Sequence, residues 1–312
     1  MLKRIEVSQL RVGMFIESLE GAWLNTPLAG RRFLLESETD AHTLKRSNVS
    51  GIFINTAKGL DASPSFPPST RSIRPPAPAS LAKKKAAVVT MLSETTVLLK
   101  GVFDAARDGS DVTVAAVAPI ITQIAGTAHR NGDLLLSMTR LKSKDETTFL
   151  HCIAVSALMI RFGRYLKQDE ETVRALGMAG LLHDIGKLAV PSDVLQKETT
   201  LTDDEMHVIR QHPMHGHGML SRQADMPEIV LDVCLHHHER IDGKGYPHGL
   251  TGDAISQYAR IAAICDVYDA ITSVRAYKRA WSAQEASTWM LERKGYFDRP
   301  LLMQFLNGVL QS

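Results

Sequence analysis

Histidine and aspartate are concentrated in one part of this chain. Eight of the twelve histidines lie between His183 and His238. The run His-His-His-Glu-Arg-Ile-Asp-Gly-Lys-Gly-Tyr-Pro occupies residues 236–247, and the pair His183-Asp184 precedes it. Neutral imidazole nitrogens and anionic carboxylate oxygens are the ligands that transition metals take from proteins. The sequence therefore predicts a transition-metal site.

His151 and Asp266 are further candidates, because each is a polar residue in an otherwise apolar segment. A carboxylate is costly to bury unless it pairs with a cation or binds a metal. Each residue alone has a simpler explanation. A lone histidine is more often a hydrogen-bonded core residue, Asp266 could pair with Arg260 or Lys187, and the run of three histidines could end a helix at the surface. Taken together, these residues favour a metal site over packing.

The elements that position these residues follow a proline-rich segment. Residues 61–80 contain six of the thirteen prolines and five serines, so we expect a semi-extended linker over 61–82. The preceding domain, 1–60, is predicted to be a small α+β unit, because short apolar runs alternate with turn residues. Its expected elements are strands at 12–16, 32–35 and 51–54, with a helix over 39–47.

From residue 83 to residue 312, apolar residues recur at helical spacing. This predicts a mostly α protein with a helical region over 83–312. Thr202 and Glu205 form a capping box, and Pro213 suits the first turn of the next helix. Pro119 is expected to kink or divide its helix. The expected helices are 86–107, 112–125, 146–166, 170–183, one from 203 to about 212, 256–273, 282–293 and 299–310.

Composition narrows the class of protein. The chain has 312 residues, of which 44% are apolar and 22% charged, and this suits two ordinary globular domains. A net charge of +2 argues against general binding to DNA or to membrane surfaces. We see no secretory segment and no run of about 18 apolar residues that would span a membrane. Cys152, Cys234 and Cys265 are typical of reduced, buried thiols, so we expect a cytoplasmic protein.

Residues 145–310 resemble an HD-GYP domain, the group of HD-superfamily phosphohydrolases that degrades cyclic di-GMP in bacteria. The motifs that carry the resemblance are His183-Asp184-Ile185-Gly186-Lys187, His212-Pro213, His237-His238-Glu239-Arg240, Asp242-Gly243-Lys244-Gly245-Tyr246-Pro247 and Asp266-Val267-Tyr268-Asp269-Ala270. Residues 1–60 resemble the domain of unknown function that is often found upstream. The resemblance implies a cyclic di-GMP phosphodiesterase that releases linear pGpG and, after a second cleavage, GMP.

The resemblance also implies two metals and a set of site residues. The ligands of one metal would be His151, His183, Asp184 and Asp266. The ligands of the second, which shares Asp184, would be Asp184, His212, His237 and His238. Lys187 would lie beside the metal-bound oxygen, and the substrate phosphate would contact Arg275 and Lys278. The residues that correspond to the signature loop are Asp242, Gly243, Gly245, Tyr246 and Pro247.

The chain departs from the family pattern at two places. Thr147 stands where some members have a glutamate that helps to bind a third metal, and Glu146 lies about 100° away on a helix, so we expect two metals. The loop after the Asp266 helix lacks the usual aspartate and proline, although its two cations, Arg275 and Lys278, remain. The histidines that match no ligand position, and that we expect at the surface or behind the ligands, are His215, His217, His236 and His248.

A pair of metals suits the hydrolysis of a phosphodiester, whose negative charge repels hydroxide. Two divalent metals would lower the pKa of a bridging water and neutralise charge on the attacked phosphate. Ligands rich in histidine argue against magnesium and suit iron or manganese. Lys187 could orient the bridging hydroxide, while Arg275 and Lys278 could hold the second phosphate of a cyclic dinucleotide.

Two other functions stay open from the sequence. One is a cyclic-dinucleotide sensor with little turnover, and the other is an HD phosphohydrolase that acts on a different cyclic dinucleotide. Tyr246 could shape the site or dock a signalling protein, and the domain 1–60 could also contact such a partner. The helical stretch 83–125 could mediate a homodimer.

Overall fold

The computed structural model describes residues 2–22, 32–46, 48–61, 78–140, 147–197, 199–274 and 280–310. They belong to two compact units, the first within residues 1–75 and the second within residues 76–310. Each unit is described by itself.

The first unit is a four-stranded antiparallel sheet with one α-helix. The strands have the order β1-β4-β2-β3, with bounds Leu2–Ile5 for β1, Phe15–Ala22 for β2, Phe33–Leu34 for β3 and Asn48–Asn55 for β4. The helices are the 3-10 helix η1, Val7–Gln9, and α1, Glu38–Arg46. Ile16, Leu44 and Ile54 are buried in its core. The α+β prediction is confirmed, and β1 was not predicted because Ile5 is its single buried residue.

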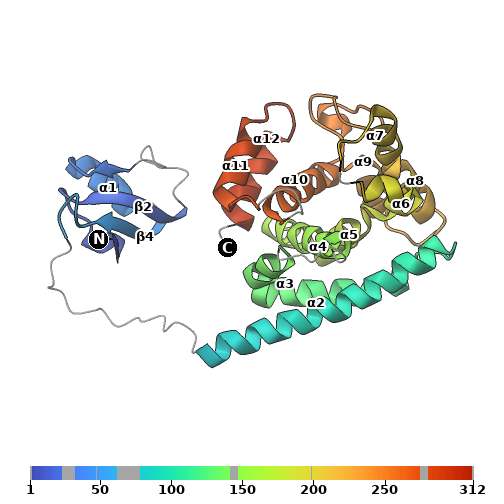
Figure 1. Ribbon diagram of the computed structural model, residues 1–312, viewed down its shortest axis with the longest axis horizontal. Coiled ribbons are helices and arrows are strands. Elements are labelled where there is room, and N and C mark those ends of the chain that lie inside the picture. The colour runs from blue at the N-terminus through green and yellow to red at the C-terminus, as the bar shows by residue number, and fades with distance from the viewer. Residues whose placement is uncertain are drawn as a thin grey trace. The chain divides into compact units, whose positions relative to one another are not determined.

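The second unit is helical, as predicted, and Figure 1 shows α4 and α5 side by side near its centre, with α3 and α2 on one side of them. Its α-helices are α2 (Pro78–Arg107), α3 (Val114–Thr139), α4 (Thr147–Tyr165), α5 (Glu170–Leu182), α6 (Ser192–Leu195), α7 (Asp203–Arg210), α8 (His212–Leu220), α9 (Glu228–His236), α10 (Gln257–Thr272), α11 (Ala283–Glu292) and α12 (Arg299–Gln304). Its other helices are the 3-10 helices η3 (Ile185–Ala189) and η4 (Gly252–Ala254) and the π-helix η5 (Phe305–Val309).

The two central helices are buried almost all round. Every residue from 150 to 160 on α4 and from 175 to 182 on α5 is buried. A helix that is apolar on all faces belongs in the interior of a protein. The polar residues that these helices carry therefore lie in the interior too, held by a closely packed frame.

The helix boundaries follow local signals in the sequence. The capping box between Thr202 and Glu205 starts α7, and Pro213 lies in the first turn of α8, as predicted. Pro119 does not divide its helix, which was one of the two expected outcomes, because α3 continues through this residue near its N-terminal end. The helical geometry is interrupted instead at Asn131, where φ is −144° and ψ is 39°.

Helix α2 differs from the sequence expectation at two points. It begins at Pro78, so the last residues of the expected linker, 78–82, belong to a helix. Its stretch Leu81–Arg107 is also long and apolar enough to cross a membrane by length and composition alone, and about a third of the apolar window is buried. Core helices meet the same criterion, and α2 places Leu99 and Phe103 in the helical core.

Candidate metal centre

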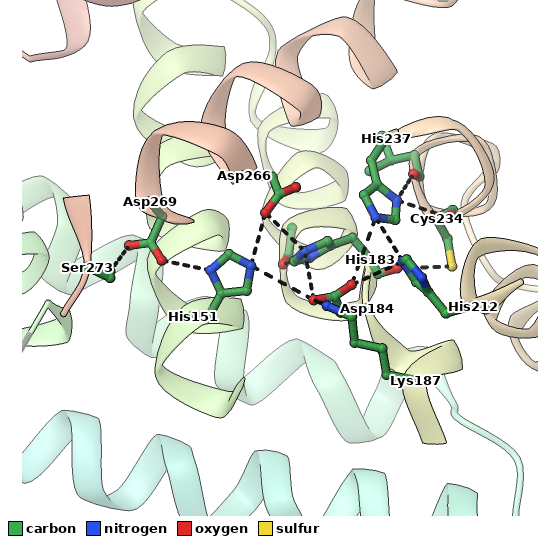
Figure 2. A network of polar contacts seen from close by, with 12 residues as sticks. His151, His183, Asp184, Lys187, His212, Cys234, His237, Asp266, Asp269 and Ser273 are labelled. Carbon is green, nitrogen blue, oxygen red and sulfur yellow. Dashed lines mark hydrogen bonds and ion pairs between the residues drawn. The ribbon is translucent and has the colours of Figure 1, made fainter. Parts of the chain in front are cut away.

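Side chains from five parts of the helical unit converge on one point, as Figure 2 shows for most of them. The contributing positions are His151 on α4, His183 at the C-terminal cap of α5 with Asp184 beside it, His212 at the start of α8, His237 and His238 at the end of α9, and Asp266 on α10. These are the seven residues that the sequence proposed as ligands, and the structure brings all of them together in two groups.

The first group consists of His151, His183 and Asp266, whose potential ligand atoms lie within 4.8 Å of one another. Nε2 of His151 lies 3.1 Å from Oδ1 of Asp266, and Nε2 of His183 lies 3.9 Å from the same oxygen. All three residues are buried. Two imidazole nitrogens and a carboxylate oxygen that converge in this way form a set of donors for one transition metal.

The second group consists of Asp184, His212, His237 and His238, again within 4.8 Å of one another. Nε2 of His212 lies 3.3 Å from Nε2 of His237 and 3.3 Å from Oδ1 of Asp184. Nε2 of His237 lies 3.9 Å from that oxygen. This group therefore offers three nitrogens and one oxygen to a second metal.

Asp184 lies between the two groups and directs a different oxygen toward each. Its Oδ2 lies 3.4 Å from Nε2 of His183 and 3.9 Å from Nε2 of His151, while its Oδ1 faces His212 and His237. Among the described residues, Oδ1 of Asp184 and Nε2 of His183 are buried without a hydrogen-bond partner. An unsatisfied buried polar atom costs about 1–3 kcal/mol, and coordination would satisfy both atoms. The donors present thus fit a metal pair that shares Asp184.

The backbone orients three of the histidines for this role. Nδ1 of His183 lies 2.9 Å from the carbonyl oxygen of Gly180, and Nδ1 of His212 lies 2.8 Å from that of Ile209. Nδ1 of His237 lies 3.1 Å from the carbonyl oxygen of Val233. A carbonyl only accepts hydrogen bonds, so each Nδ1 carries the proton and each Nε2 keeps its lone pair for a metal.

Asp269 is a residue of the site to which the sequence reading gave no role. Its Oδ2 lies 2.7 Å from Nδ1 of His151, and its Oδ1 accepts a hydrogen bond from the hydroxyl of Ser273 at 3.1 Å (Figure 2). A carboxylate behind a ligating histidine fixes the orientation of the ring and strengthens it as a ligand. The available signal was spacing, because Asp269 lies one helical turn beyond Asp266 and so on the same side of the helix.

Burial and charge set the protonation of the ligands in opposite directions. Burial acts against the charged form of His151, but hydrogen bonds with Asp266 and Asp269 outweigh it and raise its pKa from 6.5 to about 9. Burial lowers the pKa of His183 and His237, and it lowers that of His238 to about 3. Without a metal, His151 is therefore protonated at neutral pH, whereas these three histidines are neutral.

Lys187 adds a cation beside the Asp184 oxygen that faces the first group. Its Nζ donates to Oδ2 of Asp184 at 2.5 Å. Burial raises the pKa of Asp184, but the charge of Lys187 and the neighbouring histidines together hold it well below the usual value. Burial also opposes the charge on Lys187, but Asp184 outweighs it and raises the lysine pKa. Asp184 is therefore ionised and ready to ligate, and Lys187 is a fixed positive charge beside it.

The signature loop folds back over the second group and is tied to the ligand segment by Glu239. The buried carboxylate of Glu239 accepts hydrogen bonds from the backbone N–H of His248 at 2.7 Å and of Leu250 at 3.0 Å. A Cβ at Gly245 would meet Cα of Glu239 at 2.5 Å, so this close approach requires glycine. Asp242 binds the guanidinium of Arg240 at 2.6 Å.

Tyr246 in this loop packs directly on the ligands. Its ring stacks on that of His238, with centroids 4.6 Å apart and an interplanar angle of 30°, and its edge-on distance to the His212 ring is 6.5 Å. Burial, followed by the charges of Asp266 and Asp184, raises the pKa of Tyr246. The phenol therefore stays neutral and covers one side of the site.

Other residues named from the sequence are not among the seven proposed ligands. Arg275 and Lys278, the proposed phosphate contacts, fall outside the described residues, and so does Glu146. Four histidines match no ligand position, and all four lie outside both ligand groups: His215, His217, His236 and His248. His236 bonds instead to Asp232, with Nδ1 2.8 Å from Oδ1. The three cysteines are buried, as predicted.

Comparisons with known proteins agree with the motifs. A model of the HD domain matches residues 128–301, and a model of a domain of unknown function (DUF3391) matches residues 2–117. The chain is 43% identical over 318 aligned residues to Cyclic di-GMP phosphodiesterase PA4108 from Pseudomonas aeruginosa, which covers 99% of this chain and 77% of that protein.

Two further matches are less complete or more distant. The chain is 34% identical over 172 residues to 3'3'-cGAMP-specific phosphodiesterase 1 from Vibrio cholerae, which covers 55% of this chain and 40% of that protein. Among solved structures, Bd1817, an HDG"Y"P protein from Bdellovibrio bacteriovorus, matches with a TM-score of 0.59 and 19% identity over the whole of both chains. At this identity the likeness supports the fold alone.

The HD domain model matches more than half of the chain, and the Pseudomonas relative is similar over nearly all of it. The signature Gly245-Tyr246-Pro247 follows the paired histidines His237 and His238. The chain therefore belongs to the HD-domain family, within its HD-GYP group, and carries the DUF3391 domain at its N-terminal end.

Proposed function

We propose that this chain is a metal-dependent phosphodiesterase that hydrolyses cyclic di-GMP to linear pGpG and, after a second cleavage, to GMP. The observation that carries the proposal is the pair of ligand groups that share Asp184. The Pseudomonas relative, named as a cyclic di-GMP phosphodiesterase, supports the choice of substrate. We expect the protein to act in the cytoplasm.

We propose two divalent transition metals, iron or manganese, as the cofactors. His151, His183, Asp184 and Asp266 would hold one of them. Asp184, His212, His237 and His238 would hold the other. Five nitrogen donors favour iron or manganese over magnesium, which prefers an all-oxygen shell. When bound, such a pair makes hydroxide available near neutral pH and neutralises charge on a phosphodiester.

The residues of the chain would share the remaining tasks. Lys187, already fixed beside Asp184, is placed to attract a phosphate oxygen and to stabilise negative charge as it develops. Asp269 would keep the ring of His151 in the orientation that ligation needs. We keep Arg275 and Lys278 as proposed phosphate contacts, because two cations three residues apart in the sequence suit an anionic dinucleotide.

A panel of substrates tests the proposal. Purified protein is incubated with cyclic di-GMP, 3'3'-cGAMP and cyclic di-AMP, and the products are separated by chromatography. We expect cyclic di-GMP to be cleaved fastest, with pGpG appearing before GMP. Faster cleavage of 3'3'-cGAMP would show that this chain acts on a different cyclic dinucleotide, the one named in the Vibrio relative. Binding of cyclic di-GMP without cleavage in the metal-loaded protein would assign the sensor function.

We also propose that α2 mediates a homodimer. Val89 and Val97 are exposed on this helix, about 80° apart around its axis. Two copies packed antiparallel about a twofold axis would cover these two residues. Sedimentation of the wild type and of Val97→Glu tests this. We expect a dimer and a monomer respectively, and a monomeric wild type would contradict the proposal.

A further inference from the structure

Arg210 lies at the edge of the metal centre without being one of its ligands. It is the last residue of α7, two positions before His212. Its guanidinium carbon lies 5.5 Å from the centroid of the Tyr246 ring, over the ring. Since that ring stacks on His238 at 4.6 Å, a continuous series of contacts leads from a proposed ligand to this cation.

The charge of Arg210 is not neutralised in the part of the chain that the structure describes. Its side chain is exposed, and no hydrogen bond or ion pair with a described residue engages it. Two neighbouring cations differ in this respect, because Arg240 binds the carboxylate of Asp242 at 2.6 Å and Lys187 binds that of Asp184 at 2.5 Å. Arg210 thus has free donors beside a site built for an anion.

The position over Tyr246 prepares the guanidinium for an anionic ligand. An arginine that lies over an aromatic ring uses its flat face there and keeps its in-plane N–H donors free. Those donors match the spacing of phosphate oxygens and can bind them in pairs. The ring also restricts the side chain before the ligand arrives, which lowers the entropy lost on binding.

We propose that Arg210 forms a subsite for the phosphate of the cyclic dinucleotide that is not being cleaved. The inference rests on the proposed function, because it assigns a place to the second phosphate of that substrate. One phosphate must lie at the two ligand groups for cleavage, and the other then needs a cation outside them. The sequence suggested Arg275 and Lys278 for this role, and among the described residues Arg210 is placed to take part in it. Arg210 would bind it from the α7 side, with Tyr246 as the surface between the two subsites.

A purely structural role of Arg210 makes a different prediction. If the guanidinium only held Tyr246 in place, its loss would disturb His238 and slow every substrate alike. A phosphate subsite would affect only substrates that carry a second phosphate. Bis(p-nitrophenyl) phosphate has a single phosphodiester group and needs the catalytic centre alone, so a comparison with cyclic di-GMP separates the two roles.

The test measures kcat and KM for both substrates in wild type, Arg210→Ala and Arg210→Lys, with Arg222→Ala as the control at an exposed arginine of the same helical unit. We expect Arg210→Ala to raise KM for cyclic di-GMP about tenfold or more, since a charge-assisted bidentate contact is lost. Its kcat/KM for bis(p-nitrophenyl) phosphate should stay within about twofold of wild type. The KM of Arg210→Lys for cyclic di-GMP should lie between those of wild type and Arg210→Ala. The control Arg222→Ala should match wild type on both substrates.

Equal losses on both substrates, or an unchanged KM for cyclic di-GMP, would overturn the inference. A wild type that cleaves bis(p-nitrophenyl) phosphate but not cyclic di-GMP would contradict the proposed function instead. In that case, equilibrium dialysis with cyclic di-GMP decides the inference. Weaker binding to Arg210→Ala than to wild type would support the subsite, and equal binding would overturn it.

Discussion

Oδ2 of Asp269 lies 2.7 Å from Nδ1 of His151. Asp266, one helical turn before Asp269, places its Oδ1 3.1 Å from Nε2 of the same ring. Helix α10 therefore contacts both nitrogens of one histidine on α4. One carboxylate belongs to the ligand group, and the other lies behind it. This arrangement fixes the ring from both sides and makes the geometry of the first ligand group depend on the packing of α10 against α4.

Asp269→Asn should weaken metal binding while leaving the fold intact. The amide cannot hold the His151 ring as a carboxylate does, and loss of such a partner typically lowers metal affinity about 10–100-fold. Competition with a chelator measures the affinity, and circular dichroism checks the fold. Asp253→Asn, at an exposed carboxylate before α10, is the control and should bind metal like wild type. Equal affinities in all three proteins would show that Asp269 does not support the ligand.

Metal binding should release a proton from His151. Its pKa of about 9 in the metal-free protein means that it is protonated at pH 7, and a histidine must lose that proton to ligate. Apparent metal affinity should therefore rise with pH until about pH 9. His238, with a pKa of about 3, is already neutral and should contribute no proton.

Calorimetry in buffers of different ionisation enthalpy measures the number of protons released. We expect His151 to contribute about one proton at pH 7, beyond any released by metal-bound water, and fewer at pH 9, because His151 is then partly deprotonated. Asp269→Asn removes one of the two carboxylates that raise this pKa, so it should release less at pH 7. Release that does not change between pH 7 and pH 9 would contradict the assignment to His151.

The ligand set could be proposed from the sequence because its members either belong to short motifs or are polar residues in apolar segments. His183-Asp184 and His237-His238 are adjacent pairs, and His151 and Asp266 are conspicuous among apolar neighbours. Helix α9, which carries the second pair, was not predicted, since its apolar run is short and follows Pro227. The mostly helical fold was predictable for the same kind of reason, namely regular apolar spacing along the chain.

Partners that lie far apart in the sequence could not be predicted. The contact between Asp269 and His151 joins α10 to α4, and it exists because those helices pack together. Glu239 was visible in a motif, but its role depends on the path of the loop that brings His248 and Leu250 back to it. Local patterns carry no information about either arrangement.

Gly186→Ala should destabilise the protein strongly. A Cβ at Gly186 would lie 1.9 Å from the carbonyl oxygen of His212, because η3 and α8 pack backbone against backbone. Relief of this overlap would move α8 and with it His212, so we expect a loss of about 3 kcal/mol or more. Denaturant unfolding measures the change.

Gly218→Ala is the matched control, since it lies on α8 with open space around its Cβ position. Alanine in a helix should leave stability unchanged or raise it by about 0.5–1 kcal/mol relative to glycine. Gly186→Ala should therefore lower the unfolding midpoint, and Gly218→Ala should not. A Gly186→Ala protein as stable as Gly218→Ala would contradict the packing of η3 on α8.

The central claim is that Asp184 joins two metal sites into one hydrolytic centre. Its most direct test is metal analysis of anaerobically purified protein, followed at once by cyclic di-GMP turnover, on wild type and Asp184→Ala. We expect about two iron or manganese ions per wild-type chain, and loss of both metal and turnover in the variant, because Asp184 contributes an oxygen to each site. Retained turnover in metal-replete Asp184→Ala, or more than two metals per wild-type chain, would contradict this account.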